Sequence, residues 1–240
     1  MTHRLVAWDV DHTLVENSGV SKLVYASAYR KLTGADPEFP PQTEGRTDRA
    51  IMRLLFALHG RKPPPWQVID RMLTSSGMDH QSLLSRIGFP LPGAVSALRR
   101  ISREAGIVQT VLTGNIRTNA QLKLAVFRLE GWLDLDVGAY GSDGTDRADL
   151  VPLVQQRAGS KYGPGFDLLN TTIIGDTPRD VEAGRSGGAR VVAVASGQYS
   201  VLQLRRAGAS IVLPNLLDTD LLLRAVTSAE GDVLSPPGRP

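Results

Sequence analysis

Five short runs of aliphatic and β-branched residues recur along the chain, and they alternate with stretches in which apolar residues return every three or four positions. The runs cover residues 5–8, 108–112, 171–174, 191–194 and 211–213. A short continuous apolar run is typical of a strand buried on both faces, whereas the longer period is typical of an amphipathic helix. The alternation predicts an α/β fold, with a doubly wound parallel sheet covered by helices on both faces.

The gap between the first two runs, residues 9–107, is unusually long. A single parallel crossover needs only about a dozen residues or somewhat more, so this gap holds an inserted unit. Helical spacing recurs in it at residues 21–32, 48–59 and 66–87, with proline-rich breaks at 34–42 and 62–65. We expect a small α-helical cap at this point.

The insertion divides the chain into three expected regions. The core comprises residues 1–15 and 91–230, the helical cap residues 16–90, and a disordered tail, rich in glycine, proline and serine, residues 231–240. The connecting segments near residues 16–19 and 89–93 are placed to act as hinges. A cap attached in this way is able to close over one edge of the sheet.

Composition excludes several other kinds of protein. The 240 residues include no cysteine, which excludes disulfides and thiolate metal sites, and the net charge is only +3. The arginine pairs at 99–100 and 205–206 lack interleaved aromatic residues, which favours solvated helix faces over a nucleic-acid site. The first apolar run leaves no room for a signal peptide, and no segment reaches the roughly 20 apolar residues of a membrane span. We expect a cytoplasmic protein without a nucleic-acid or membrane partner, and the oligomeric state stays open.

Two carboxylates follow the first apolar run directly, in the sequence Asp9-Val10-Asp11-His12-Thr13. Side-chain direction repeats every two residues in an extended chain, so Asp9 and Asp11 project to the same side. Ligands of parallel α/β sheets bind beyond the carboxyl ends of the strands. Paired acids at such an end indicate a site for Mg²⁺ and phosphate.

Two further motifs follow later runs. Thr113-Gly114-Asn115 ends the second run with a hydroxyl group and backbone amides that suit an anion. In Gly175-Asp176-Thr177-Pro178, after the third run, Thr177 is able to cap a helix that begins at Pro178, which places Asp180 in the first turn near Asp176. Each motif alone is an ordinary turn or helix start, but the ordered set predicts one phosphate site.

In this order and spacing, the motifs resemble those of the haloacid dehalogenase (HAD) superfamily, in particular phosphatases with a helical cap between the first and second motifs, such as phosphoglycolate phosphatases. The resemblance covers nearly the whole chain before the tail. It implies a Rossmann-like core and a Mg²⁺-dependent hydrolase that cleaves the phosphate monoester of a small metabolite through an aspartyl-phosphate intermediate. The substrate itself is not specified, because selectivity resides in cap contacts.

The resemblance also implies roles for the acids. Asp9 attacks phosphorus, and Asp11 protonates the leaving alcohol and later activates water. The side chains of Asp9 and Asp176 and the carbonyl of Asp11 hold Mg²⁺, with Asp180 positioning the ion or its waters.

The phosphate clamp follows from the second and third motifs of the family. Thr113, with the amides of Gly114 and Asn115, grips the phosphoryl oxygens, and a cation completes the clamp. Arg147 occupies about the place where the family usually has lysine. Lys161, in a glycine-rich loop after the next expected helix, is the alternative, and both stay open here. An arginine offers a planar fork where lysine offers a point charge, so the exchange is not neutral.

Two residues near the expected cap have open roles. Arg46 lies in a cap loop before a helix, where it is either a surface arginine or a substrate-specificity contact. His12 stands where many relatives carry glycine, and it is either a solvent-facing linker residue or a contact to the cap or substrate.

Other reactions and functions are alternatives to the hydrolysis of a phosphate ester. Dehalogenases on the same scaffold lack the second acid, so Asp11 disfavours that chemistry. A phosphomutase of the β-phosphoglucomutase type keeps all the motifs and stays open. A signalling module that accepts phosphate without turnover is the alternative from another class, although such modules are shorter and lack a cap.

Overall fold

The centre of the molecule is a five-stranded parallel sheet in the order β4-β1-β5-β6-β7. The computed structural model describes residues 3–227. The strands are β1 (Arg4–Trp8), β4 (Ile107–Val111), β5 (Thr171–Gly175), β6 (Arg190–Val194) and β7 (Ile211–Leu213). All five predicted strands are confirmed to within one residue at each end. The order adds what the sequence does not contain, namely that β1 lies between β4 and β5.

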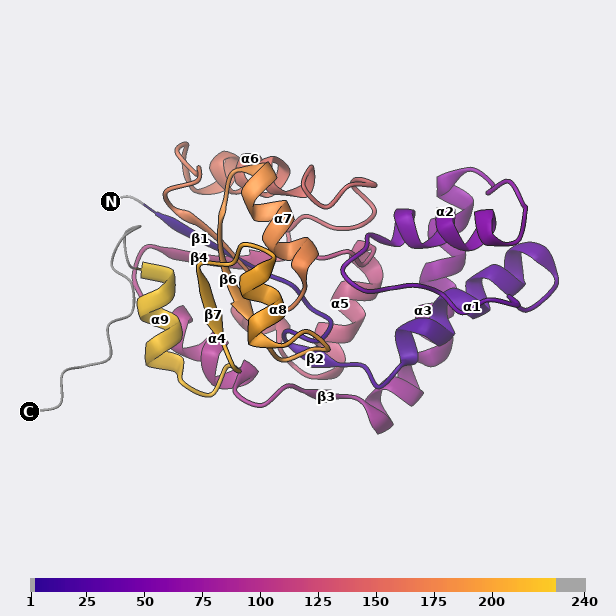
Figure 1. Ribbon diagram of the computed structural model, residues 1–240, viewed down its shortest axis with the longest axis horizontal. Helices are drawn as coiled ribbons and strands as arrows, with labels where there is room; N and C mark the ends of the chain where they lie inside the picture. Colours follow the sequence, from indigo (N-terminus) through magenta and orange to yellow (C-terminus); the bar gives the residue numbers. More distant parts are fainter. Residues whose placement is uncertain (1–2, 228–240) are drawn as a thin grey trace, which may run out of the picture.

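Helices cover both faces of this sheet, as Figure 1 shows. One face carries α4 (Ala94–Ser102), α5 (Arg117–Val126) and α9 (Thr219–Thr227), and the other carries α6 (Leu150–Tyr162), α7 (Pro178–Gly187) and α8 (Val201–Arg206). Successive side chains of β1 point to opposite faces of the sheet, so Val6 and Trp8 pack into one core cluster and Leu5 and Ala7 into the other. The doubly wound α/β class is therefore confirmed.

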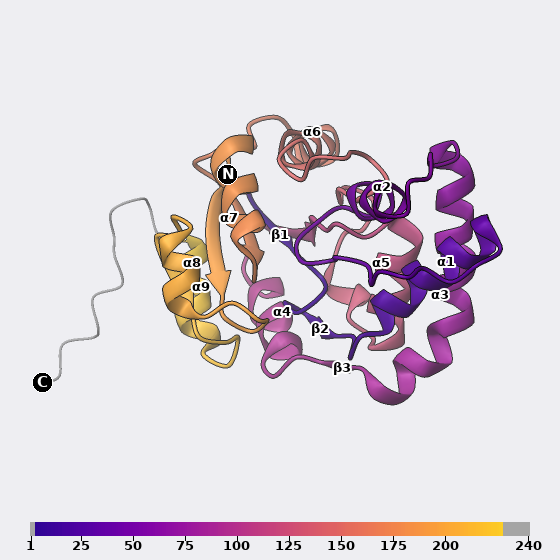
Figure 2. The same ribbon diagram turned by 45° about the vertical axis from the view of Figure 1, so that its right-hand side comes forward.

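The long insertion between β1 and β4 forms a separate helical layer, on the right of Figures 1 and 2. It holds α1 (Val20–Thr33), α2 (Asp48–Leu58) and α3 (Trp66–Ile87), which match the predicted helical stretches closely. These helices bury their own apolar cluster, which includes Tyr29, Met52 and Leu73. Ile116, at the start of α5, joins that cluster, and α3 packs along α5, so the inserted helices sit directly on the core.

The two segments that lead into and out of the insertion run side by side. β2 (Val15–Glu16) and β3 (Phe89–Pro90) pair as a short antiparallel ribbon, with Val15 opposite Pro90. This ribbon joins the two segments that were expected to act as hinges. The domain limits at residues 15–16 and 90–91 stay a prediction, and the expected tail at 231–240 lies outside the described residues. Between residues 3 and 227, every helix is too short or too polar to cross a lipid bilayer.

Candidate active site

The site lies where three neighbouring strands end. β1 is parallel to β4 and β5 and lies between them, so the residues after all three strands leave the same edge of the sheet. The ladders continue into these loops, because the N–H of Asp9 donates to the carbonyl of Ile174 at 2.8 Å and that of Leu112 donates to the carbonyl of Trp8 at 2.8 Å. The acid motif and the two later motifs therefore meet.

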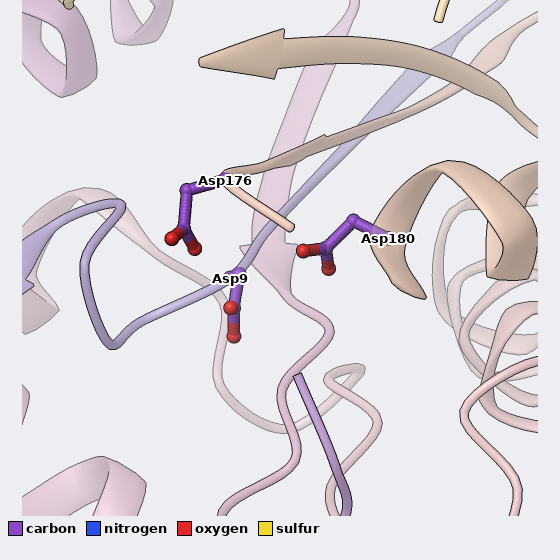
Figure 3. Close-up of side chains that lie close together, drawn as sticks. All are labelled: Asp9, Asp176 and Asp180. Carbon is purple, nitrogen blue, oxygen red and sulfur yellow. The ribbon is translucent and has the colours of Figure 1, made fainter. Parts of the chain in front are cut away.

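Three of the expected acids form one buried cluster. Carboxylate oxygens of Asp9, Asp176 and Asp180 all lie within 4.8 Å of one another. Figure 3 shows Asp9 following β1, Asp176 following β5 and Asp180 on the helix beyond it. That helix is held by a capping box in which Thr177 accepts from the amide of Asp180, while the Asp180 carboxylate accepts from the amide of Thr177 at 3.0 Å. The predicted helix start thus aims Asp180 at the other two acids.

A buried guanidinium group joins the cluster. Nη2 of Arg147 lies 3.0 Å from Oδ1 of Asp9 and 2.5 Å from Oδ1 of Asp180. It also donates to the carbonyl of Leu112 at 3.3 Å. Lys161, the alternative cation, is exposed at the surface and pairs with Asp134 at 2.6 Å. Lys161 lies within α6 and not, as expected, in a loop after it, because α6 continues through the glycine at 159 to Tyr162.

The cluster is short of positive charge. Burial raises the pKa of Asp9 to about 6 against the opposing pull of Arg147, and the charges of Asp180 and Asp11 add to the rise. Burial likewise raises the pKa of Asp176 well above its ordinary value, with Asp180 and Asp9 adding to it. Three carboxylates and one guanidinium leave two negative charges uncompensated. A divalent cation that prefers hard carboxylate oxygens, such as Mg²⁺, fits this donor set.

Asp11 has a different environment from that cluster. Nζ of Lys123 lies 2.8 and 2.6 Å from its two carboxylate oxygens, and the side-chain amides of Asn115 and Asn17 each donate to it at 2.9 Å. Burial alone raises the pKa of a carboxyl group, but Lys123 and Asn115 outweigh it and lower the pKa of Asp11. The protein itself therefore holds Asp11 in the ionised form.

Lys123 is the functional candidate that the sequence motifs missed. It lies on α5, is 6 % exposed, and also donates to Oγ of Ser21 on α1 at 2.9 Å and to Oδ1 of Asn115 at 2.6 Å. The sequence does carry a signal, since Lys123 falls on the same helical face as Ala120 and Leu124, which are buried. A lysine on an apolar face needs a buried partner.

The turn after β4 holds the remaining expected phosphate contacts. Gly114 and Asn115 line the cavity beside the acids. Thr113 is fully buried, and its hydroxyl accepts from the side-chain amide of Asn115 at 2.9 Å. Gly114, which has no side chain, therefore presents its backbone to the cavity, while the Thr113 hydroxyl accepts from the backbone N–H of Asn115 at 3.3 Å within the turn.

A cavity of about 300 Å³ connects these groups with the inserted helices. Its core wall includes Asp9, Asp11, Arg147 and Asp176, and its other wall includes Lys22, Tyr25, Thr43, Glu44 and Arg46. His12 also lines it, with a φ of 58°, in the left-handed region that favours glycine, and its ring contacts Glu16 at 3.0 Å. The structure therefore brings every expected site residue except the fully buried Thr113 and Asp180 to the cavity wall, and both of these are hydrogen-bonded or ion-paired to residues of that wall.

The sequence profile of the haloacid dehalogenase-like hydrolases matches residues 6–185, a span that contains all of these residues. The chain belongs to the haloacid dehalogenase-like hydrolase family. The expected resemblance is confirmed at the level of the family, and the protein is an enzyme of the hydrolase class. Among curated protein sequences, none matches this HAD-like hydrolase.

Solved structures share its fold over almost the full length. A hydrolase from Pseudomonas syringae has 20 % sequence identity and a TM-score of 0.69, with 94 % of this chain and 100 % of that chain covered. A protein described as a predicted phosphatase from Clostridium acetobutylicum has 16 % identity and a TM-score of 0.65, covering 93 % and 100 %. One described as a predicted phosphoglycolate phosphatase from Haemophilus somnus has 15 % identity and a TM-score of 0.63, covering 93 % and 99 %. At these identities the likeness shows the fold.

Proposed function

We propose that this HAD-like hydrolase is a Mg²⁺-dependent phosphatase that cleaves the phosphate monoester of a small metabolite through an aspartyl-phosphate intermediate. The observation that carries the proposal is the buried cluster of Asp9, Asp176 and Asp180 with Arg147, which is two positive charges short of neutrality and borders a cavity. Such a cluster suits a divalent ion together with a phosphoryl group, because each offsets the charge of the other.

Asp9 is the proposed nucleophile. Its carboxylate oxygen forms a bond to phosphorus as the bond from phosphorus to the ester oxygen breaks, and the leaving alkoxide takes a proton from Asp11. In the second displacement, water attacks the phosphorus of the aspartyl-phosphate, Asp11 takes a proton from that water, and the carboxylate of Asp9 is released. Ionised Asp11 is ready for this second step as the structure stands. An entering phosphate dianion raises the proton affinity of Asp11 and so favours the protonated form that the first step needs.

The acids of the cluster are the proposed metal ligands. The side chains of Asp9 and Asp176 and the carbonyl of Asp11 would hold Mg²⁺, and Asp180 would position it. A bound Mg²⁺ neutralises the repulsion between an anionic nucleophile and an anionic substrate. The observed shortage of positive charge in the cluster supports this assignment.

Arg147 is the proposed phosphate-clamping cation, together with Thr113 and the amides of Gly114 and Asn115. Its position 3.0 Å from Asp9 supports Arg147 over Lys161. Arg147→Met is expected to lower kcat/KM by about 10²- to 10³-fold, as for other transition-state donors. Lys161→Met is the matched control and is expected to leave kcat/KM unchanged. The reverse pattern would assign the clamp to Lys161.

The cavity supports a small, polar substrate. Its wall is built from charged and polar side chains, glycines and Tyr25, and its volume of about 300 Å³ suits the phosphate ester of a small metabolite. Arg46 is the proposed specificity contact, because it lines this cavity and its guanidinium has no hydrogen bond or ion pair among residues 3–227.

Steady turnover of p-nitrophenyl phosphate with Mg²⁺ tests the proposal. A screen of phosphoglycolate, sugar phosphates and nucleotides then identifies the substrate class. Stoichiometric phosphorylation without turnover would indicate a signalling module, and isomerisation that depends on a bisphosphate would indicate a phosphomutase. Salt-sensitive nucleic-acid binding that survives Asp9→Asn would indicate a binding protein.

A further inference from the structure

A further buried carboxylate, Asp48, lies outside the aspartate cluster and takes no part in the steps proposed above. It is the first residue of α2 and is 1 % exposed. Its Oδ1 accepts from the hydroxyl of Tyr25 on α1 at 2.6 Å, and its Oδ2 accepts from the backbone amide of Ile116 at 2.8 Å. Its own backbone N–H donates to the carbonyl of Gly114 at 2.7 Å. One residue of the inserted helices thus holds both ends of the turn formed by residues 114–116.

The segment that contains Asp48 also packs tightly against this turn. A Cβ placed on Gly114 would lie 2.1 Å from the carbonyl oxygen of Arg46, so only glycine fits there. A Cβ placed on Gly141 would lie 1.7 Å from the carbonyl oxygen of Gly114, on the core side. The turn is therefore enclosed between residues 46–48 of the insertion and Gly141 of the core, and neither neighbour can move toward the turn without displacing it.

Asp48 also completes the start of α5. The N-cap residue of α5, Ile116, has no side chain that caps the helix, and the Asp48 carboxylate accepts its amide hydrogen instead. A negative charge at a helix N-terminus is favourable. Asn115 immediately precedes this point, and Lys123 lies further along the same helix. Asp48 therefore fixes the position of the segment that carries both residues in contact with Asp11.

We propose that Asp48 is a positioning residue that sets the Gly114–Asn115 turn for phosphate, so that the turn holds its binding geometry only while the inserted helices are seated on the core. The inference rests on the proposed function in one respect, that this turn contacts the phosphoryl group. Arg46 lies two residues before Asp48 in the same segment. The same segment therefore carries both Arg46, which would contact the leaving group, and Asp48, which holds the turn that contacts the phosphoryl group.

Calorimetric titration with inorganic phosphate in the presence of Mg²⁺ tests the inference on the full chain. Asp48→Ala removes both side-chain contacts and is expected to raise the Kd for phosphate by about tenfold or more. Asp48→Asn keeps an oxygen for the Ile116 amide and an amide group for Tyr25, and it is expected to stay within about threefold of the wild type. Asp79→Ala is the control, since Asp79 is an exposed carboxylate of α3 that pairs with Lys31. Equal phosphate affinity of Asp48→Ala and the wild type would overturn the inference.

Hydrogen exchange separates positioning from a general loss of stability. In Asp48→Ala, peptides that cover residues 113–117 are expected to exchange faster, while peptides that cover β5 keep their protection. Faster exchange in both regions, with phosphate affinity unchanged, would indicate a purely structural role. If Asp48→Ala does not fold, Tyr25→Phe takes its place, with an expected rise in the phosphate Kd of about two- to fivefold and faster exchange at 113–117. Unchanged values in Tyr25→Phe would then overturn the inference.

The outcomes also separate this inference from the proposed function. A wild-type protein that turns over no phosphate ester, yet binds phosphate in a manner that depends on Asp48, refutes the function and keeps the inference. An active enzyme whose phosphate affinity is the same with alanine at position 48 keeps the function and refutes the inference. An active enzyme that binds no phosphate also refutes the inference, because the turn is then not a phosphate site.

Discussion

Asp9 and Asp11 lie two residues apart on the same loop, Asp9 buried and Asp11 half-buried, yet their surroundings are opposite. Asp9 shares Arg147 with Asp180 and lies close to Asp176, and burial raises its pKa to about 6. Asp11 accepts hydrogen bonds from Lys123 and from two side-chain amides, and its pKa is lowered. The protein alone satisfies Asp11, whereas the region around Asp9 is satisfied only when a cation is added. The difference is the basis for proposing that the Asp9 half of the site binds the metal ion and the phosphoryl group.

The two environments also draw on different parts of the chain. The acids around Asp9 come from the ends of β1 and β5 and from the first turn of α7. The groups around Asp11 come from the start of the insertion, from the turn after β4 and from α5, and Lys123 contacts Ser21 on α1 as well. The first half of the site is therefore fixed by the sheet, and the second half depends on the inserted helices.

Asp9→Asn is expected to have the largest effect. The amide is a poor nucleophile, so turnover of p-nitrophenyl phosphate is expected to fall by at least about 10⁴-fold, as for other covalent nucleophiles. The melting temperature is expected not to fall, because the change removes a negative charge from a cluster that has too many. Asp143→Asn, at an acid paired with Arg157 on the surface, is the control. Full activity in Asp9→Asn would rule out Asp9 as the nucleophile.

Asp176→Asn tests the metal side of the comparison. Removing one carboxylate from the cluster is expected to raise the half-saturating Mg²⁺ concentration by about 10- to 100-fold. In the wild type, added Mg²⁺ is expected to raise the melting temperature, because an ion that binds only the folded state stabilises it. That stabilisation is expected to shrink in Asp176→Asn. An unchanged Mg²⁺ requirement would place the ion elsewhere.

Lys123→Met tests the environment of Asp11. Asp11 then loses its cation and its fixed position, and kcat is expected to fall by about 10- to 100-fold, a typical cost of a misplaced catalytic group. The Mg²⁺ concentration for half-maximal activity is expected to stay the same, because Lys123 does not touch the acid cluster. Lys161→Met, at an exposed lysine, is the matched control. If Lys123→Met changed the Mg²⁺ requirement as much as Asp176→Asn does, the two halves of the site would not be separate.

The sequence predicts the sheet half of the site well and the other half poorly, for a physical reason. Asp9, Thr113 and Asp176 each follow a buried strand, and parallel strands bring such positions to one edge by rule. The sequence did not contain the position of β1 between β4 and β5, nor which of Arg147 and Lys161 joins the acids. Asp48 and Lys123 gain their roles from how the inserted helices sit on the core. The apolar face of α5 indicates that Lys123 is buried but not which group it contacts, and Asp48 at a helix start looks like an ordinary N-terminal acid.

Asp48 combines features of both environments, since it is fully hydrogen-bonded like Asp11 but has a raised pKa like Asp9. Burial raises its pKa from 3.8 to about 6, although the hydrogen bonds from Tyr25 and Ile116 and the charge of Lys123 oppose the rise. A carboxyl group with a raised pKa in the folded state binds its proton more tightly there than in the unfolded state. It therefore favours folding at low pH, and this contribution is lost as the pH rises from about 4 through 6.

Asp48→Asn does not titrate and is expected to be spared this loss. The free energy of unfolding of Asp48→Asn, measured with urea, is expected to increase relative to that of the wild type as the pH rises from 4.5 to 7.5. The raised pKa sets an upper limit of about 3 kcal/mol on this improvement. Asp79→Asn is the control, because Lys31 lowers the pKa of that exposed carboxyl group and no such improvement is expected. A difference between Asp48→Asn and the wild type that is constant with pH would show that Asp48 stays ionised throughout, and its environment would then match that of Asp11 and not that of Asp9.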